Sequence, residues 1–314
     1  MIKRNPIIWF CAILALAAVA QVPGSIRLAT TYTPNSWLLY SISVHSTLVT
    51  ATTQHAAMHA TLDTEAEAQL HILPGATTNN FEVSARFTRY KTTAATDNPA
   101  QKAELEQQAS ATDRAATSMK PAVFRVANGT LRITFRQPGD NYDQPVDMLS
   151  EIVRNDDLPS GAVTVGAQWT RTRTRSIPKT TIAMPLTLHC RLSALGSEAG
   201  EKTAVIVINS AASANLPPGS LPGSQQLARE GLVPLGKFSF NTVATSTYRA
   251  ADGVLLGTKS QTHSNMNLQF IGPSPQAVTS DTEIHSTGSV RLEKILRAPG
   301  KDQEPGSGNR ILYY

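Results

Sequence analysis

Apolar and polar residues alternate one by one over unusually long stretches of the chain. In residues 37–49 five apolar side chains fall on even positions: Leu38, Tyr40, Ile42, Val44 and Leu48. Residues 55–73 repeat the pattern with His, Asp, Glu and Gln on odd positions. A period of two places the apolar side chains on one side of an extended strand. Alanine is frequent in the second stretch and favours a helix by propensity. The sustained alternation nevertheless predicts two long strands, each with one solvated face.

The same pattern predicts further strands along the whole chain. A Pro-Gly turn precedes a third alternating strand at residues 81–88, so the first three strands are expected to form an antiparallel meander. Asn128 and Gly129 tolerate positive φ angles and predict a hairpin between residues 121–127 and 130–135. Five more strands are expected, at residues 182–195, 202–209, 238–250, 254–270 and 281–296.

Two segments are predicted to be helical. Asn98 is a suitable cap for a helix that starts at Pro99 and ends near residue 109, and this helix contains so few large apolar residues that it should lie on the surface. A second helix, at residues 143–154, begins with Asp143 as its cap. Its apolar residues share one face and should pack on a sheet: Val146, Leu149, Ile152 and Val153.

Residues 157–175 join two differently patterned halves of the chain. Pro159 is expected to stop the preceding helix, and Gly161 and Gly166 to redirect the backbone into a strand that Trp169 anchors. Three alternating arginines should then project from one side of this strand: Arg171, Arg173 and Arg175. Such a stripe indicates either a solvated strand face or a contact with anionic lipid headgroups, an acidic glycan or an acidic partner protein.

Together these elements predict a mainly β (α+β) protein. The expected architecture is a long curved antiparallel meander or half-barrel with one or two packed helices. The predicted divisions are a signal peptide at 1–20, a linker at 21–35, a β-rich domain at 36–297 with a sub-boundary near 157–166, and a flexible tail at 298–314.

The N-terminus predicts export. Lys3 and Arg4 precede an apolar run at residues 7–19, and the run ends in an Ala-x-Ala site that predicts cleavage between Ala20 and Gln21. The run has about 14 residues at most, too few to cross a hydrocarbon core of about 30 Å as a helix, so a retained anchor is the weaker alternative. The mature chain is therefore expected in the periplasm, the envelope or the extracellular space.

Charge and cysteine content exclude some classes of protein. The full chain has 28 Lys plus Arg against 23 Asp plus Glu, and removal of Lys3 and Arg4 leaves 26 against 23. This small excess does not favour nucleic acid as a partner. Cys190 is the only cysteine left after cleavage, so no internal disulfide can form, and a small buried hydrophobe is its expected role. Nothing in the composition indicates an oligomeric state.

Motifs of established chemistry are missing from the sequence. The mature chain contains no Gly-x-Ser-x-Gly, Gly-x-x-x-x-Gly-Lys or Gly-x-Gly-x-x-Gly. His55 and His59 have the spacing of a helical metal pair, but on a strand they would lie about 13 Å apart, with His45 on the preceding strand facing one of them. We therefore expect no catalytic residue, metal or cofactor. An enzyme whose site is spread over several strands is retained as an alternative.

Two resemblances suggest a function. Leu158-Pro159 followed by residues 165–169 (Val-Gly-Ala-Gln-Trp) resembles the LP…VGxxW signature of uncharacterised secreted bacterial β-rich proteins. The strand layout also resembles the LolA-like half-barrel of lipoprotein carriers, which implies a concave apolar surface for acyl chains. On that resemblance, the expected ligand-binding residues are Leu62, Leu70, Ile72, Trp169, Arg171, Arg173 and Arg175.

The resulting hypothesis is a non-enzymatic envelope or secreted protein that binds a hydrophobic or amphipathic ligand such as a lipid. The alternatives are an envelope structural or protein-interaction module, an outer-membrane barrel and an uncharacterised enzyme. Lipid or an acidic envelope component is the expected partner, and no cofactor is expected.

Overall fold

The computed structural model describes residues 24–53, 56–78, 80–127, 130–138, 143–177, 180, 182–221, 224–272, 278–297 and 312–313. The predicted signal peptide and its cleavage site between Ala20 and Gln21 lie outside the described residues. So do His55, the tip of the predicted Asn-Gly hairpin and most of the predicted tail.

Long antiparallel strands dominate the fold. The strands are β1 (Ile26–Arg27), β2 (Ser36–Thr52), β3 (Met58–Ile72), β4 (Asn80–Thr96), β5 (Ala122–Ala127), β6 (Thr130–Phe135), β7 (Ala162–Val163), β8 (Gln168–Ser176), β9 (Ala183–Glu198), β10 (Glu201–Leu216), β11 (Val233–Arg249), β12 (Leu255–Ile271), β13 (Val278–Arg297) and β14 (Leu312–Tyr313). The helices are α1 (Pro99–Ser118), α2 (Asp143–Val153) and α3 (Ser224–Arg229).

The large sheet has the strand order β6-β5-β4-β3-β2-β13-β12-β11-β10-β9-β8, with β14 added beside β13. Apart from the pairing of β2 with β13, every neighbour on this path follows its partner directly in the chain as a strand. The predicted meander of the first three long strands is confirmed by the registers of β2 with β3 and of β3 with β4. The first and last long strands meet at the centre of the sheet, where Ile42 lies opposite Val290.

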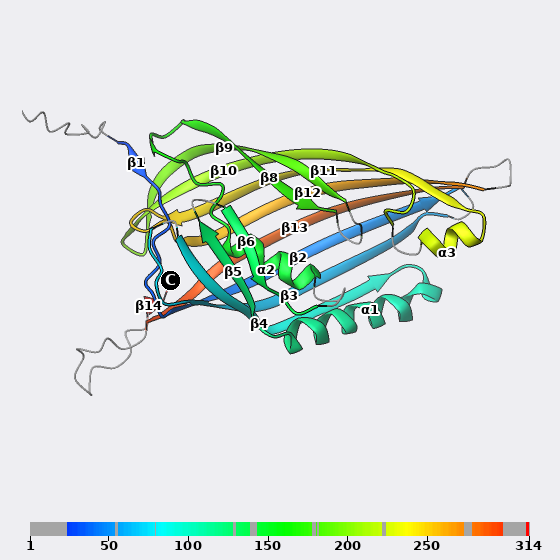
Figure 1. Ribbon diagram of the computed structural model, residues 1–314, viewed down its shortest axis with the longest axis horizontal. Helices are drawn as coiled ribbons and strands as arrows, with labels where there is room; N and C mark the ends of the chain where they lie inside the picture. Colours follow the sequence, from blue (N-terminus) through cyan, green and yellow to red (C-terminus); the bar gives the residue numbers. More distant parts are fainter. Residues whose placement is uncertain are drawn as a thin grey trace, which may run out of the picture.

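The sheet is strongly curved and open (Figure 1). Strands β6 and β8 end the strand order, and within the described residues they do not pair with each other. The predicted mainly β half-barrel is thereby confirmed, whereas a closed outer-membrane barrel is not what this sheet forms. We call the end at β1 and β14 the proximal end and the end at α3 the distal end (Figure 1).

Both hydrophobic cores lie on the same face of the sheet, which we call the inner face. The first core cluster includes Leu38, Leu70 and Phe124 from β2, β3 and β5. The second includes Leu186 and Ile206 from β9 and β10. The register pairs even-numbered inner residues across most of the long strands, so the odd-numbered residues form the outer face.

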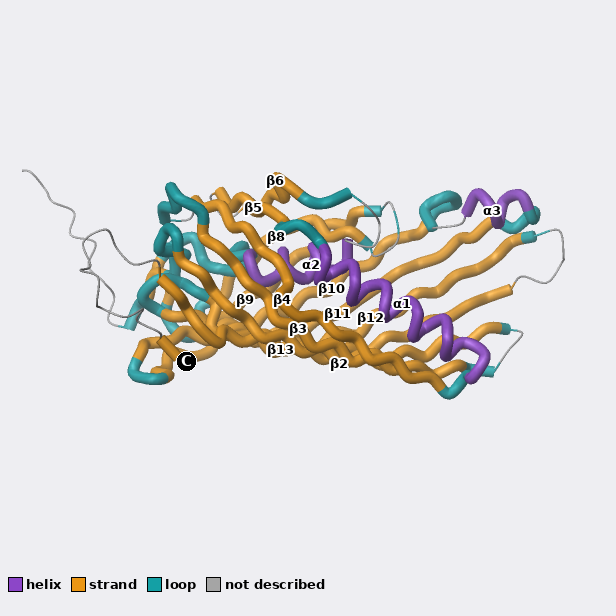
Figure 2. Tube along the Cα trace, turned by 90° about the horizontal axis from the view of Figure 1, so that it is seen from below, coloured by secondary structure: helices purple, strands orange, loops and turns teal. Residues whose placement is uncertain are grey.

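Helix α1 covers a free edge of the sheet. Strand β5 pairs with β4 only over residues 80–85, and beyond that point the Asp113 carboxylate of α1 accepts a hydrogen bond of 2.8 Å from the Thr92 N–H of β4. Figure 2 shows α1 running along this part of β4. The helix is longer than predicted because its contact is made by small side chains that leave no strong apolar periodicity: Ala109, Ala115 and Ala116.

Helix α2 packs on the inner face, as its amphipathic sequence predicts. Its apolar side chains are buried in the first core cluster: Val146, Leu149, Ile152 and Val153. Helix α3 lies beside β11 at the distal end (Figure 1). Strands β10 and β11 extend further toward that end than predicted, since hydroxylated and small residues there interrupt the large apolar pattern.

Residues 24–35, which the sequence predicts as a linker, pack against the proximal end. Leu28 and Tyr32 are buried, and the Thr31 N–H donates a 2.8 Å hydrogen bond to the Asp252 carbonyl. Gly253 beside this contact has a φ of 62°, and a Cβ there would come within 2.9 Å of the Ala29 backbone. Strand β1 pairs with β7, and β14 in the predicted tail pairs with β13.

Candidate functional site

The residues that β2, β3 and β10–β13 contribute to the distal inner face include no charged or amide side chain. At the inward positions of residues 44–52, 58–64, 208–216, 234–244, 258–270 and 278–290, all side chains are apolar, Ser, Thr or Gly. The His, Asp, Glu, Lys, Asn and Gln residues of the same stretches occupy outward positions. This sorting distinguishes the inner face from an ordinary solvated sheet face.

Much of this apolar surface remains partly exposed. The inward side chains of β2, β3, β12 and β13 near the distal end are half-buried, in contrast to the fully buried residues at the proximal end: Leu48, Met58, Leu62, Met266, Leu268, Phe270 and Ile284. Met266 and Leu268 pack against the second core cluster. The distal inner face therefore offers apolar contact area that the chain itself covers incompletely.

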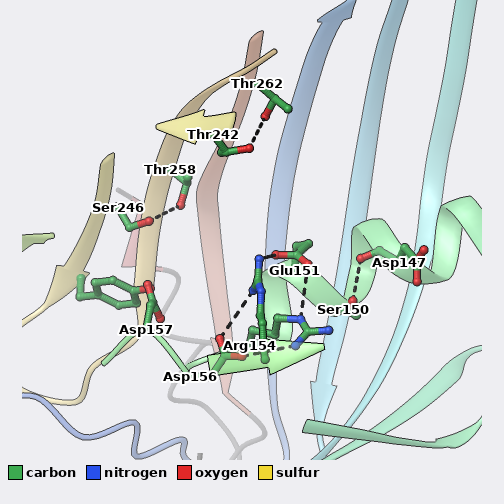
Figure 3. Close-up of polar contacts among 12 residues, drawn as sticks. Asp147, Ser150, Glu151, Arg154, Asp156, Asp157, Thr242, Ser246, Thr258 and Thr262 are labelled. Carbon is green, nitrogen blue, oxygen red and sulfur yellow. Dashed lines mark hydrogen bonds and ion pairs between the residues drawn. The ribbon is translucent and has the colours of Figure 1, made fainter. Parts of the chain in front are cut away.

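Hydroxyl groups on the inner face pair with one another across neighbouring strands. The cross-strand oxygen–oxygen distances are 2.8 Å for Ser46–Ser286, 2.9 Å for Thr242–Thr262, 3.0 Å for Ser246–Thr258, 3.1 Å for Thr64–Thr92 and 3.2 Å for Thr50–Thr282. Figure 3 shows two of these pairs. Each of these ten hydroxyls has one partner, so an apolar molecule could cover them at a lower desolvation cost than unpaired hydroxyls would impose.

Four charged side chains connect α2 to the edge strand β8, and we call this network the bridge: Glu151, Arg154, Asp156 and Arg173 (Figure 3). Arg173 lies 3.2 Å from Glu151 and 3.7 Å from Asp156, and Arg154 lies 3.4 Å and 3.3 Å from the same carboxylates. The bridge therefore ties a helix anchored in the first core cluster to a strand that belongs to the opposite side of the half-barrel.

The electrostatics of the bridge favour the ionised form of the Glu151 carboxyl. Desolvation alone would raise the pKa of the Glu151 carboxyl, but the charges of Arg173, Arg154 and Arg175 outweigh it, so this pKa is lowered below its ordinary value. The charged form of Arg173 is favoured as well. Burial alone would lower the pKa of its guanidinium, but the charges of Glu151 and Asp156 raise it above its ordinary value.

The predicted arginine stripe is one-sided, and the structure places it on the inner face. Trp169, Arg171 and Arg173 pair with the inward residues Cys190, Leu188 and Leu186 of β9. The Arg171 guanidinium donates to the Leu158 carbonyl at 2.8 and 3.2 Å, and the Trp169 indole N–H donates to the Asp157 carbonyl at 2.8 Å. A fully solvated strand face, one of the two predictions for this stripe, is therefore wrong for Arg171 and Arg173.

Arg175 differs from the other two arginines. Its side chain is exposed, and its guanidinium carbon lies 5.0 Å from the ring centroid of Phe240 on the inner face. This distance is within the range of a cation–π contact. Arg175 thus places a positive charge next to the second core cluster while remaining accessible to solvent.

Asp157, next to the bridge, is a buried carboxyl. The Tyr248 hydroxyl donates a hydrogen bond to its Oδ2. Burial raises the pKa of Asp157 to about 6; the bond from Tyr248 lowers it and the neighbouring charge of Asp156 raises it further. Sequence patterns gave no indication of this pair, because its members lie 91 residues apart.

The remaining predicted site residues fall into two groups. Leu70 and Ile72 are completely buried in the first core cluster, so they stabilise the fold and are closed to a ligand. Leu62 is half-buried on the distal inner face. Cys190 is buried, as predicted, and burial raises the pKa of its thiol to about 12, which disfavours the reactive thiolate.

Replacement of Arg173 by alanine should lower the free energy of unfolding by about 1–2 kcal/mol, because two carboxylates of the bridge lose a partly buried partner. Urea unfolding measures this change. Thr174→Ala is the matched control, since Thr174 is the next residue on β8 and is exposed on the outer face. Equal unfolding midpoints for the two variants would contradict a stabilising role for the bridge.

Three side chains on the outer face could hold a metal ion. They are His263 on β12 and Glu283 and His285 on β13, and their ligand atoms all lie within 4.8 Å of one another. The pair suggested by the sequence differs: the His45 ring lies 2.6 Å from Asp63, while the Cα partner of His59 is Val49. His45, His263 and His285 border one outer-face hollow of about 320 Å³.

Among the described residues, no helix is both long and apolar enough to span a membrane.

Comparisons with known proteins give only distant likenesses. No protein-family model and no curated protein sequence matches the chain. A solved structure of lipovitellin, described by its lipid–protein interactions, is 13% identical over 89% of this chain, with a TM-score of 0.42, and the chain spans 27% of its length. An outer membrane channel from Pseudomonas putida F1 is 8% identical over 84% of this chain and 97% of its own, with a TM-score of 0.26.

Proposed function

We propose that this protein binds an acyl-chain lipid on the distal inner face of its half-barrel, in the extracytoplasmic compartment to which the predicted signal peptide directs it. The observation that carries the proposal is the complete sorting of charged and amide side chains to the outer face along six long strands. A face that is only solvated has no need of such sorting, whereas a face that receives an apolar ligand does.

The geometry of the surface suits a chain-like ligand. The half-buried apolar residues lie on both sides of the sheet centre, from Leu48 and Leu62 on β2 and β3 to Leu268 on β12. The paired hydroxyls between them share hydrogen bonds, so an acyl chain that covers them meets a smaller desolvation cost than isolated hydroxyls would impose. Curvature of the sheet (Figure 1) increases the area that one bound chain can contact.

Arg175 is the residue that we assign to the lipid headgroup. Arg171 donates a hydrogen bond to the Leu158 carbonyl, and Arg173 forms ion pairs with the bridge carboxylates. The exposed guanidinium of Arg175 instead lies over Phe240. An anionic headgroup beside this guanidinium would allow its acyl chain to lie on the adjacent apolar surface. Of the seven ligand-binding residues expected from the sequence, the proposal therefore keeps Leu62 and Arg175.

Titration of the mature protein with a fluorescent fatty acid tests the proposal. Leu268→Glu should weaken binding by at least about tenfold, because a carboxylate placed against an acyl chain costs more than about 1.4 kcal/mol. Gln269→Glu, which adds the same charge at the neighbouring exposed outward position, should change the affinity by less than about twofold.

Mass spectrometry of an organic extract gives an independent check. We expect an acyl lipid to co-purify with the wild-type protein and to be depleted in Leu268→Glu. Two results would overturn the proposal: absence of both lipid and fatty-acid binding in a folded preparation, or equal loss of affinity in Leu268→Glu and Gln269→Glu.

A further inference from the structure

The outer face carries a cluster of two histidines and one carboxylate at the centre of the sheet. His263 of β12 and His285 of β13 are direct partners in the antiparallel register. Glu283 precedes His285 by two residues, so its side chain leaves the same face of β13. The backbone register itself therefore holds the three side chains together, since direct cross-strand neighbours have Cβ atoms about 5 Å apart.

The side-chain geometry is close to that of a metal site. Each histidine places its Nε2 atom 3.0 Å from the same Glu283 oxygen, Oε1. Ligand atoms about 2.0–2.1 Å from a tetrahedral ion lie about 3.3 Å apart, so only small rotations of the side chains are needed to enclose one. The two imidazole rings, with centroids 4.3 Å apart, already lie side by side.

The donor set indicates which kind of cation fits. Two imidazole nitrogens and one carboxylate oxygen suit Zn²⁺ and related first-row divalent ions, whereas Mg²⁺ and Ca²⁺ prefer oxygen ligands alone. We propose that His263, Glu283 and His285 form a binding site for a zinc-class divalent metal ion on the outer face of the sheet.

The surroundings leave the ion accessible. The three side chains are about half exposed, with exposed fractions of 51% for His263, 45% for Glu283 and 55% for His285. Three protein ligands leave a fourth coordination position for water or another small ligand. Both histidines border the outer-face hollow, whose other lining residues include His45, Asn241 and Gln261. A small polar ligand in this hollow could reach the open position of the ion.

Calorimetric titration of the mature, tag-free protein with Zn²⁺ tests this site. We expect one equivalent to bind to wild type, and His263→Ala and His285→Ala each to weaken that binding on the order of 100-fold through loss of one of three ligands. Glu283→Gln should weaken it about tenfold, since an amide oxygen is a poorer ligand for Zn²⁺ than a carboxylate.

His189→Ala serves as the control, because His189 is an exposed outward histidine on β9, away from the cluster. It should bind Zn²⁺ within about twofold of wild type. Unfolding midpoints measured without metal establish that all variants are folded. At a Zn²⁺ concentration about ten times the Kd of wild type, wild type and His189→Ala should gain thermal stability, Glu283→Gln should gain less, and the single His variants should gain almost none, because an ion that binds the folded state alone shifts the unfolding equilibrium in proportion to its occupancy.

Two results would overturn the metal site: a folded His263→Ala/His285→Ala double variant that binds Zn²⁺ as tightly as wild type, or wild type that shows no saturable binding. The site lies on the opposite face from the proposed lipid surface. Failure of fatty-acid binding would therefore leave this result unchanged.

Discussion

Replacement of Leu149 by alanine is expected to lower the free energy of unfolding by about 3 kcal/mol. Leu149 is completely buried where α2 enters the first core cluster, and truncation of a buried leucine loses transfer free energy and leaves a cavity. Chemical denaturation gives the value directly. Gln144→Ala on the exposed side of the same helix should change it by less than about 0.5 kcal/mol.

A double-mutant cycle with Arg173→Ala tests whether α2 and β8 are held by the same contact. Leu149 anchors the helix on one side, and the bridge ties its Glu151 to Arg173 on the other. If loss of Leu149 loosens α2, Arg173→Ala should cost less in that background than in wild type, by at least about 0.5 kcal/mol. Strict additivity would show that the bridge keeps its geometry without the helix anchor.

Replacement of Asp157 by asparagine should remove a component of the pH dependence of stability. The folded carboxyl has a pKa of about 6, above its ordinary value of 3.8, so between these limits the folded protein binds a proton that the unfolded chain does not. This group's stabilisation is complete below about pH 3.8 and is lost as the pH rises through about 6. From about pH 4.5 to 7 the expected loss in wild type is about 2 kcal/mol.

Denaturation of wild type and Asp157→Asn at about pH 4.5, 5.5 and 7 measures this component as the difference between the two proteins. Glu151, whose pKa is lowered, is present in both proteins, so its contribution cancels in this difference. Tyr248→Phe supplies the complementary variant: without the hydroxyl that lowers the pKa of Asp157, the loss should occur at higher pH. Parallel pH profiles for wild type and Asp157→Asn would contradict the assignment.

Alternation of apolar and polar residues was sufficient to predict the β-rich class and most of the long strands. The stretch predicted at residues 55–73 illustrates why: despite its alanines, residues 58–72 of it form β3, with the even residues on the inner face. Helix α2 was equally predictable, because four apolar residues lie on one side of it. Helix α1 was predicted too short, since alanine contacts carry little periodic signal.

The face to which a side chain belongs could not be read from one strand alone. The arginines of β8 were predicted to share one side of the strand. That this side faces inward follows only from the pairing of Arg173 with Leu186 of β9. One local signal was available, because Trp169 has the same parity as the arginines and an aromatic residue favours the core side. The partners of that stripe, Glu151 and Asp156, become neighbours only after α2 packs.

The histidine cluster was missed for a related reason. His263 and His285 are 22 positions apart, and no short motif connects them. A hairpin centred on position 274, within a Pro-rich segment, would have placed the two opposite each other, and the register of β12 with β13 has this centre. If this strand pairing had been assumed, the histidine cluster could therefore have been predicted from the sequence.

The pairing of β2 with β13 at the centre of the sheet, which we call the seam, affects the order in which the chain folds. Strands β2 and β13 pair along almost their full length, although Ile42 and Val290 lie 248 positions apart. The meanders β2–β4 and β9–β13 can each form from neighbouring segments, but the seam must wait until nearly all of the chain has emerged. Until then β2 presents a 17-residue unpaired edge, a template for wrong partners. The N-terminal meander therefore has to stay apart from other chains until its own C-terminal strand arrives.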